Sequence, residues 1–178
     1  IPNAGLLSGC KICPVRLLLL TKNFPYSGGE EFIEKEAIHL NDKYSLTVSP
    51  RISGAARQSS VDYSLFLRQD GIFTRLYYAV VQFPWKAFLF EVRGYSLFLH
   101  PTKLITLVFA SLEVGYGVGK LTHRRPFQDI IYSYWGSTYG LIAVNAAKEI
   151  GAKSAVRYHR GDLYEEHAGY VPFNSYLH

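Results

Sequence analysis

The start of the chain carries a strand-like pattern, then a loop, then a helix-like pattern. Residues 15–20 form a short apolar run that fits a strand buried on both faces and is too short for a typical helix. Residues 21–29 form a loop that ends with Gly28 and Gly29. From Glu30 onward, apolar residues recur at helical spacing with charged residues between them. This part of the chain therefore predicts one strand followed by one helix.

The loop before this helix has the parts of an anion-binding site. The unpaired backbone N–H groups and the positive dipole end of a helix point toward the loop that precedes it. We expect Gly28 and Gly29 to let a phosphate group approach the backbone, because glycine has no side chain. The segment lacks the G-x-G-x-x-G pattern of dinucleotide-binding proteins. The alternative is a surface turn, since Glu30 and Glu31 already suit the helix dipole.

The last third of the chain predicts a strand, a helix and a second strand. Residues 129–134 fit the first strand, and residues 154–159 fit the second. Between them, residues 138–150 show helical spacing, with Ser137 as the predicted N-cap and Gly151 as the C-terminal stop. A strand, a helix and a strand with short connections form one β–α–β unit of a parallel sheet.

The middle of the chain predicts one more strand and several helices. Residues 44–52 fit a strand. Residues 73–100 are mainly helical in pattern, with breaks near Pro84 and Gly94. Residues 101–112 predict a further helix, which begins with a proline suited to the first helical turn. Helices therefore dominate the middle third.

A glycine series at residues 115–119 follows that last helix. It is not a nucleotide-binding P-loop, because Leu121 follows Lys120 where a P-loop needs Ser or Thr. We interpret the series as the end of the helix. No transmembrane helix is predicted, because the apolar stretch at residues 104–110 is short and the stretch at residues 77–90 is interrupted.

Strand-like and helix-like segments alternate, and this predicts an α/β fold: a Rossmann-like three-layer sandwich with a mainly parallel sheet. We expect one domain over residues 15–178 and treat residues 1–14 as a tail outside the fold. In such sheets ligands bind beyond the carboxyl ends of the strands. That rule brings the glycine loop, the turn at residues 135–136 and residues 159–162 to one edge of the sheet.

Polar side chains at this predicted edge offer acid–base and anion-binding chemistry. His159 falls at the end of the last strand, where an imidazole can accept a proton or donate a hydrogen bond near neutral pH. The Asp162 carboxylate can orient that histidine or act as the base itself. Arg157 and Arg160 offer positive charge to a phosphate. The alternative is a histidine that ends a strand beside a salt-bridged Arg–Asp pair.

The charge of the chain is concentrated in its middle third. Of a net charge of +5, residues 51–125 contribute ten Lys and Arg against four Asp and Glu. A basic and aromatic segment fits a membrane interface, an acidic lipid or a nucleic acid. The alternative is a helical layer whose Lys and Arg extend along apolar surface into water. The aromatic residues of this segment are Phe73, Tyr77, Tyr78, Phe83, Trp85, Phe88, Phe90, Tyr95 and Phe98.

The composition excludes several classes of protein. Apolar residues make up 48% of the chain and charged residues 19%, which is typical of a globular protein and not of a disordered one. Cys10 and Cys13 are the only cysteines, so there is no second pair for a zinc site. The pair also precedes the first strand and does not lie at a strand-to-helix turn, which argues against a thioredoxin-type role.

Both ends of the domain resemble a known enzyme family. The segments that carry the resemblance are residues 24–34, 132–135, 156–166 and 170–173. They are similar to the amino-terminal half of bacterial retaining glycosyltransferases of family four, which have the GT-B fold. Many of these enzymes build cell-surface polysaccharides. The resemblance hardly covers the middle of the chain, which is the region that faces the acceptor in such enzymes.

The resemblance implies a role for the residues already singled out. His159 is expected near the transferred sugar as a catalytic residue, and Asp162 is expected to support that segment. Tyr134 and Trp135 are implied to contact the acceptor. The groups implied to bind the donor are Gly28, Gly29, Arg157 and Arg160.

The resemblance also implies partners and location. The donor is expected to be a nucleotide-sugar, held mostly by a second, carboxy-terminal domain, so that this chain alone would be inactive. The acceptor is expected to be a saccharide or a lipid-linked saccharide. The protein is expected to be cytoplasmic, with peripheral contact at the inner face of the membrane. No cofactor, metal or nucleic acid is expected.

Two other functions stay open at this point. The first is a non-catalytic α/β binding module that docks on a membrane or a protein partner. The second is a nucleotide-dependent enzyme of another kind that uses the Gly28–Gly29 loop.

Overall fold

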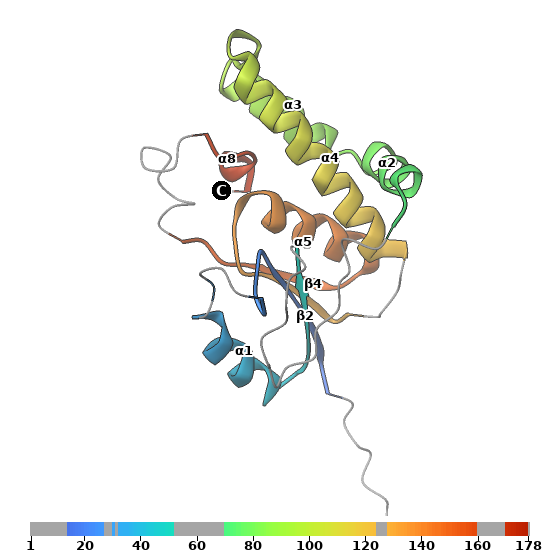
Figure 1. Ribbon diagram of the computed structural model, residues 1–178, viewed down its shortest axis with the longest axis vertical. Helices are drawn as coiled ribbons and strands as arrows, with labels where there is room; N and C mark the ends of the chain where they lie inside the picture. The colour runs from blue at the N-terminus through green and yellow to red at the C-terminus, as the bar shows by residue number, and fades with distance from the viewer. Residues whose placement is uncertain are drawn as a thin grey trace, which may run out of the picture.

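The chain forms an α/β fold around a parallel sheet (Figure 1). The computed structural model describes residues 14–26, 30, 32–51, 70–123, 128–159 and 170–177. The strands are β1 (Arg16–Thr21), β2 (Ser45–Pro50), β3 (Ile130–Ser133) and β4 (Lys153–Val156). The helices are α1 (Ile33–Asn41), α2 (Ile72–Val81), α3 (Trp85–Gly94), α4 (Pro101–His123), α5 (Ser137–Ile150) and α8 (Asn174–Leu177), with the 3₁₀ helix η1 (Leu97–Leu99).

The four strands pair in the order β2-β1-β3-β4, and every pair is parallel. Leu20 of β1 pairs with Ser133 of β3, which in turn pairs with Val156 of β4. The register therefore brings the carboxyl ends of these strands to one edge of the sheet. The prediction of a Rossmann-like α/β fold with a mainly parallel sheet is confirmed.

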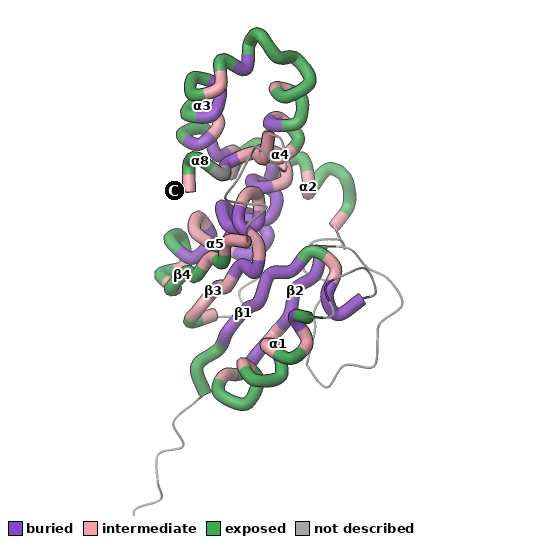
Figure 2. The backbone as a smooth tube through the Cα atoms, turned by 90° about the vertical axis from the view of Figure 1, so that its left-hand side faces the viewer, coloured by how far each residue is buried: buried purple, intermediate pink, exposed green. Residues whose placement is uncertain are grey.

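The sheet is the middle of three layers (Figures 1 and 2). Successive residues of β1 point to opposite faces, so Leu17 and Leu19 pack toward α1 while Leu18 and Leu20 pack toward α4 and α5. All four leucines are at most 4% exposed. A strand buried on both faces has a continuous apolar sequence, and that is why residues 15–20 could be recognised.

Helix α4 differs from its predicted length. It runs through the glycine series to His123, so the interpretation of that series as a helix end was wrong. A Cβ on Gly115 would lie 2.4 Å from the Ala79 carbonyl oxygen of α2. A Cβ on Gly117 would lie 2.7 Å from the Ile142 side chain of α5. The glycines thus let α4 pack closely against both neighbours, and this contact outweighs their low helix propensity.

The true length of α4 also changes the membrane prediction. With 23 residues, α4 is long and apolar enough to cross a membrane by length and composition, which the sequence analysis missed. Half of its apolar window is buried within the fold. That burial is what the core helix of a globular domain shows, and one such helix is weak support for a membrane span.

Helix α5 confirms one end of its prediction and corrects the other. Gly151 ends the helix in a left-handed conformation with φ 73°, as expected for a glycine at this position. The predicted cap was wrong, because Gly136 is the N-cap and no side chain caps the helix. Ser137 instead forms the first helical residue with a φ of 58°. Glycine and serine are both common at N-caps. Where the two residues are adjacent, the sequence alone therefore locates the start of a helix only to within one residue.

Candidate functional site

The carboxyl edge of the sheet gathers side chains from three separate segments. Glu30 precedes α1, Trp135 follows β3, and Arg157 and His159 follow β4. β4 ends at Val156 because its partner β3 ends at Ser133, so His159 lies beyond the strand that was predicted to contain it. The expectation that this edge brings distant segments together is confirmed for these described residues.

Glu30 ties two of these segments to each other. Its side chain is buried, with the residue 3% exposed. One carboxylate oxygen accepts hydrogen bonds from the backbone N–H of Asn23, at 2.5 Å, and of Phe24, at 2.7 Å. The other oxygen accepts a 2.5 Å hydrogen bond from the indole N–H of Trp135. Glu30 thus fixes the loop after β1 and orients the Trp135 ring.

Aromatic rings stack beside that indole. The His159 ring centroid lies 4.5 Å from that of Trp135 and 5.1 Å from that of Tyr134. Phe32 closes the group at 6.4 Å from His159. Tyr134 is buried beneath its neighbours, whereas Trp135 and His159 are half-buried. The exposed part of this aromatic stack can therefore contact a ligand through ring faces.

Arg157 also lies close to Tyr134. Its guanidinium carbon is 4.9 Å from the centre of the Tyr134 ring, and its Nη1 forms an ion pair with Glu36 of α1. The Tyr132 hydroxyl donates a 2.9 Å hydrogen bond to the same carboxylate. Burial together with that carboxylate raises the pKa of Tyr132 to about 12. Glu36 therefore neutralises much of the charge that Arg157 was predicted to offer to a phosphate.

A small polar pocket opens at the same edge. Its volume is about 230 Å³, and it lies at the start of α5. Lys22 and Arg51, which directly follow β1 and β2, bring two positive charges to it. Trp135, Ser137, Thr138 and Tyr139 complete the lining. Because Arg51 is itself paired with Glu113, Lys22 and the positive dipole end of α5 give this pocket its attraction for an anion.

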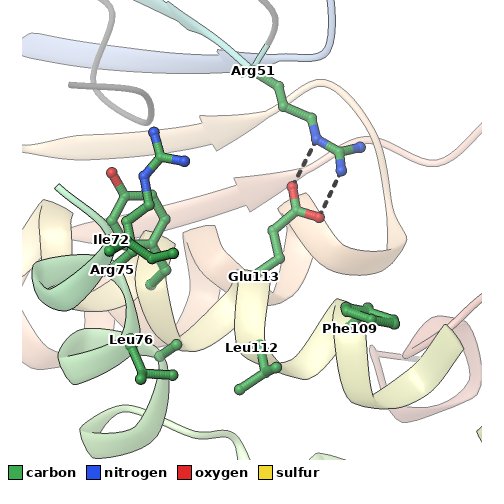
Figure 3. A pocket seen from close by; sticks show the side chains of 9 residues that line it. Arg51, Ile72, Arg75, Leu76, Phe109, Leu112 and Glu113 are labelled. Carbon is green, nitrogen blue, oxygen red and sulfur yellow. Dashed lines mark hydrogen bonds and ion pairs between the residues drawn. The ribbon is translucent and has the colours of Figure 1, made fainter. Parts of the chain in front are cut away.

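Arg51 also lines a larger, mostly apolar pocket between α2 and α4 (Figure 3). Its Nε and Nη2 each lie 2.9 Å from an oxygen of Glu113, so the pair is bidentate. Tyr139, from the small pocket, donates a 3.4 Å hydrogen bond to the same carboxylate. Burial raises the pKa of Glu113, and the Arg51 charge opposes that rise. The ion pair stands where the two pockets meet.

The structure describes four of the eight predicted site residues. The structure brings His159, Arg157, Tyr134 and Trp135 together at one edge. The other predicted site residues, Gly28, Gly29, Arg160 and Asp162, lie outside the described residues.

Sequence reasoning missed four residues of this edge. Lys22 and Arg51 directly follow β1 and β2. The predicted strand at residues 44–52 contained Arg51, and Lys22 lay inside the predicted loop at residues 21–29, so only the true strand ends place both at the carboxyl edge. Glu30 and Glu36 carried no such signal, because the partners that join them to β3 and β4 lie far away in the sequence, at 105 residues for Trp135 and 121 for Arg157.

The described part of the chain shows no cluster of metal-ligating side chains. No group of three or more His, Cys, Asp or Glu side chains there could hold a metal ion. The chemistry that the described residues offer is ring stacking, acid–base exchange at His159 and attraction of an anion by Lys22 and Arg51.

Comparison with known proteins identifies no relative. No protein family, curated protein or solved structure matches the chain. A Rossmann-like sheet supports many unrelated activities, so the fold by itself does not select one.

Proposed function

We propose that this chain is the amino-terminal domain of a glycosyltransferase with a GT-B fold. In this proposal the enzyme moves a sugar from a nucleotide-sugar to a saccharide or lipid-linked saccharide during synthesis of a cell-surface polysaccharide. The observation that carries the proposal is the stack of Trp135 and His159, 4.5 Å apart, beside a pocket with Lys22 and Arg51. Ring faces suit the apolar faces of sugars, and the cations suit phosphate.

The proposal assigns separate roles to the two parts of the edge. Trp135 contacts the acceptor sugar, and Tyr134, which is buried, supports the ring from below. His159 positions the transferred sugar, and Lys22 and Arg51 attract the diphosphate of the donor. The predicted roles of Gly28, Gly29, Arg160 and Asp162 stay predictions within this scheme.

Binding by Trp135 fluorescence tests the proposal. The chain has two tryptophans, so a Trp85→Phe background leaves Trp135 as the single reporter. Trp85 is 62% exposed on α3, which makes that change mild. We expect oligosaccharides to alter Trp135 emission, and UDP and UDP-sugars to bind weakly to this chain and clearly to a full-length protein. Tight nucleotide binding by this chain alone would favour a nucleotide-dependent enzyme of another kind.

The role of His159 has its own test in the full-length protein. We expect His159→Ala to lower turnover strongly while the circular dichroism spectrum and melting temperature stay close to those of the unmodified protein. His39→Ala is a matched control, because His39 is exposed in the last turn of α1. Normal turnover in His159→Ala would contradict the assigned role.

A second function is favoured by the tip at which α3, η1 and α4 meet (Figure 2). Phe98 and Leu99 of η1 are 79% and 78% exposed. Over residues 85–105, Lys86, Arg93 and Lys103 are exposed, while the one acidic residue, Glu91, is buried. Exposed apolar side chains among exposed cations suit an anionic membrane surface. A module that docks peripherally on a membrane is therefore the second candidate.

Sedimentation with lipid vesicles tests this second candidate. We expect the chain to sediment with vesicles that contain an anionic lipid and much less with neutral ones. Phe98→Ser with Leu99→Ser should abolish sedimentation, whereas Ile38→Ser, at a 43% exposed position of α1, should not. Equal sedimentation of both variants would rule out docking through this tip.

A further inference from the structure

Helix α2 carries aliphatic and aromatic side chains on the side that faces away from the fold (Figures 1 and 2). Ala79 packs on its inner side against α4. Six of the seven exposed residues of α2 are large and hydrophobic, and Thr74 is the seventh. A surface helix normally has charged or polar residues on its outer side. The composition of α2 therefore indicates that another surface covers it.

The exposed hydrophobic side chains of α2 continue onto α4. Phe109 of α4 is 68% exposed and lies across a groove from Leu76 of α2 (Figure 3). Aromatic side chains have about 150–250 Å² of surface each and aliphatic ones somewhat less, so the exposed fractions of all seven side chains sum to roughly 800 Å². The largest apolar patch of a typical monomer is about 300–600 Å², whereas each partner in a standard interface buries about 800 Å². We call these seven side chains the α2 face: Ile72, Phe73, Leu76, Tyr77, Val80, Val81 and Phe109.

The α2 face has a ridge beside a groove. The groove is the pocket of about 570 Å³ between α2 and α4, which Leu76 lines. Phe73, Tyr77 and Val81 are spaced four residues apart, so they form a ridge along α2 next to that groove. Packed helices insert the ridge of one into the groove of the other. A two-fold axis would place the ridge of each copy in the groove of the other copy, which makes the α2 face complementary to itself.

The charges around the α2 face favour a second copy over an anionic partner. Arg75 is the one charged residue of α2, and it is half-buried with its guanidinium carbon 5.7 Å from the centre of the Tyr116 ring. Arg51, at the other end of the groove, is paired with Glu113. A symmetric interface repeats its own charges, so it is favoured where the surface carries few of them. A helix that lies on an anionic membrane instead carries Lys and Arg on its polar face.

We propose that the α2 face is the interface of a symmetric dimer, in which α2 of one chain packs against α2 and α4 of a second copy. This inference goes beyond the proposed function, because the dimer needs no sugar, nucleotide or lipid and none of the residues of the aromatic stack. Where two copies of one helix pack about a two-fold axis, residues at the middle of the helix meet their own copies. Tyr77 is at the middle of α2 and is 60% exposed.

Sedimentation equilibrium of the 178-residue chain measures this association. We expect the mass of two chains at about 100 μM, with a dissociation constant of about 10 μM or lower. The mass of one chain would overturn the proposal and would leave a membrane or another part of a longer protein to cover the α2 face. A continuous series of larger masses would also overturn it, because a closed two-fold interface stops at two chains.

Charged variants at Tyr77 show whether the dimer uses the α2 face. Tyr77→Asp and Tyr77→Lys each place like charges opposite one another, and each should weaken association at least about hundredfold while the melting curve stays unchanged. An equal mixture of the two variants should associate again, because opposite charges then meet. Ile38→Asp should leave the dimer intact, because Ile38 is 43% exposed on α1, which covers the other face of the sheet. Undiminished association of both Tyr77 variants, or a mixture that stays monomeric, would overturn the proposal.

Discussion

Glu30 holds the loop after β1 to the turn after β3, and its removal has a predictable cost. Glu30 is 3% exposed and accepts three hydrogen bonds, from two backbone N–H groups and from Trp135. A hydrogen bond to a charged group contributes about 1.5–3 kcal/mol. Asn23 and Trp135 are half-buried, so water can replace part of the hydrogen bonding that their N–H groups lose in the variant. We expect Glu30→Ala to lower the free energy of unfolding by about 2–4 kcal/mol.

Glu30→Gln distinguishes the contribution of the two backbone hydrogen bonds from that of the hydrogen bond to Trp135. Both backbone N–H groups share one carboxylate oxygen, and the indole uses the other. A glutamine amide with its oxygen at the first position keeps the backbone bonds, but its NH₂ group then faces the Trp135 N–H. We expect a loss of about 1–2 kcal/mol, smaller than for alanine. Trp135 emission in the folded state should also shift, because the indole loses its acceptor.

Urea unfolding, followed by circular dichroism and by Trp135 emission in the Trp85→Phe background, measures both losses. Glu34→Gln on α1 is the control, with an expected change within about 0.5 kcal/mol. A loss below about 1 kcal/mol for Glu30→Ala would refute the role of Glu30 as an anchor. A glutamine variant as unstable as the alanine variant would show that charge, and not the number of acceptors, sets the effect.

Three further predictions concern packing and charge. Gly115→Ala should lower the melting temperature by several degrees, because the added methyl group meets the α2 backbone and the cost of about 1–3 kcal/mol exceeds the gain in helix propensity of about 1 kcal/mol. Lys120→Met should cost about 3–5 kcal/mol in urea unfolding, because it leaves Asp70 without the ammonium group that lies 2.7 Å away in the interior. Asp129→Asn should make the free energy of unfolding less dependent on pH in the acid range. Hydrogen bonds from Arg16 lower the pKa of Asp129 in the folded state. The ionised carboxylate therefore stabilises the fold above the ordinary carboxyl pKa, and this stabilisation is lost as pH falls through the lowered pKa.

Each of these predictions has a control. Gly94→Ala should not destabilise, since no atom lies within 4 Å of an added Cβ there; an equal loss at both glycines would refute the close contact of α2 and α4. Lys120→Met with Asp70→Leu should recover part of the stability lost in the single variant, because the double variant removes both charges of this pair. For Asp129→Asn, the unfolding curves should converge with those of the unmodified chain at low pH, and a constant difference down to that range would contradict the assigned pKa shift.

The sequence predicted the elements that local pattern controls. The apolar run at residues 15–20 indicated a strand with two buried faces, and Leu17 to Leu20 have that burial in the structure. The strand–helix–strand pattern near the carboxyl end indicated a parallel pair, and β3 and β4 form it around α5. These predictions succeeded because periodicity and the stop at Gly151 depend on neighbouring residues alone.

The candidate site could be predicted only in outline. The rule that ligands bind at carboxyl ends of parallel strands brought Trp135 and His159 to one edge, and the structure places their rings 4.5 Å apart. It did not reveal that Glu36 neutralises Arg157 or that Lys22 and Arg51 line the polar pocket. Those contacts depend on the register of strands and on the placement of α1, which no local pattern specifies.

By itself, then, the sequence determined the fold class, the order of most elements and the edge at which ligands are expected. Only the tertiary structure decided the length of α4, whose glycines are unfavourable locally and are compensated by close contact with α2 and α5. It also decided the anchoring of Trp135 by Glu30 and the ion pair of Arg51 with Glu113, partners that are 105 and 62 residues apart. The physical reason is that propensity and periodicity act over a few residues, whereas burial and charge pairing act between whatever residues the packed chain brings together.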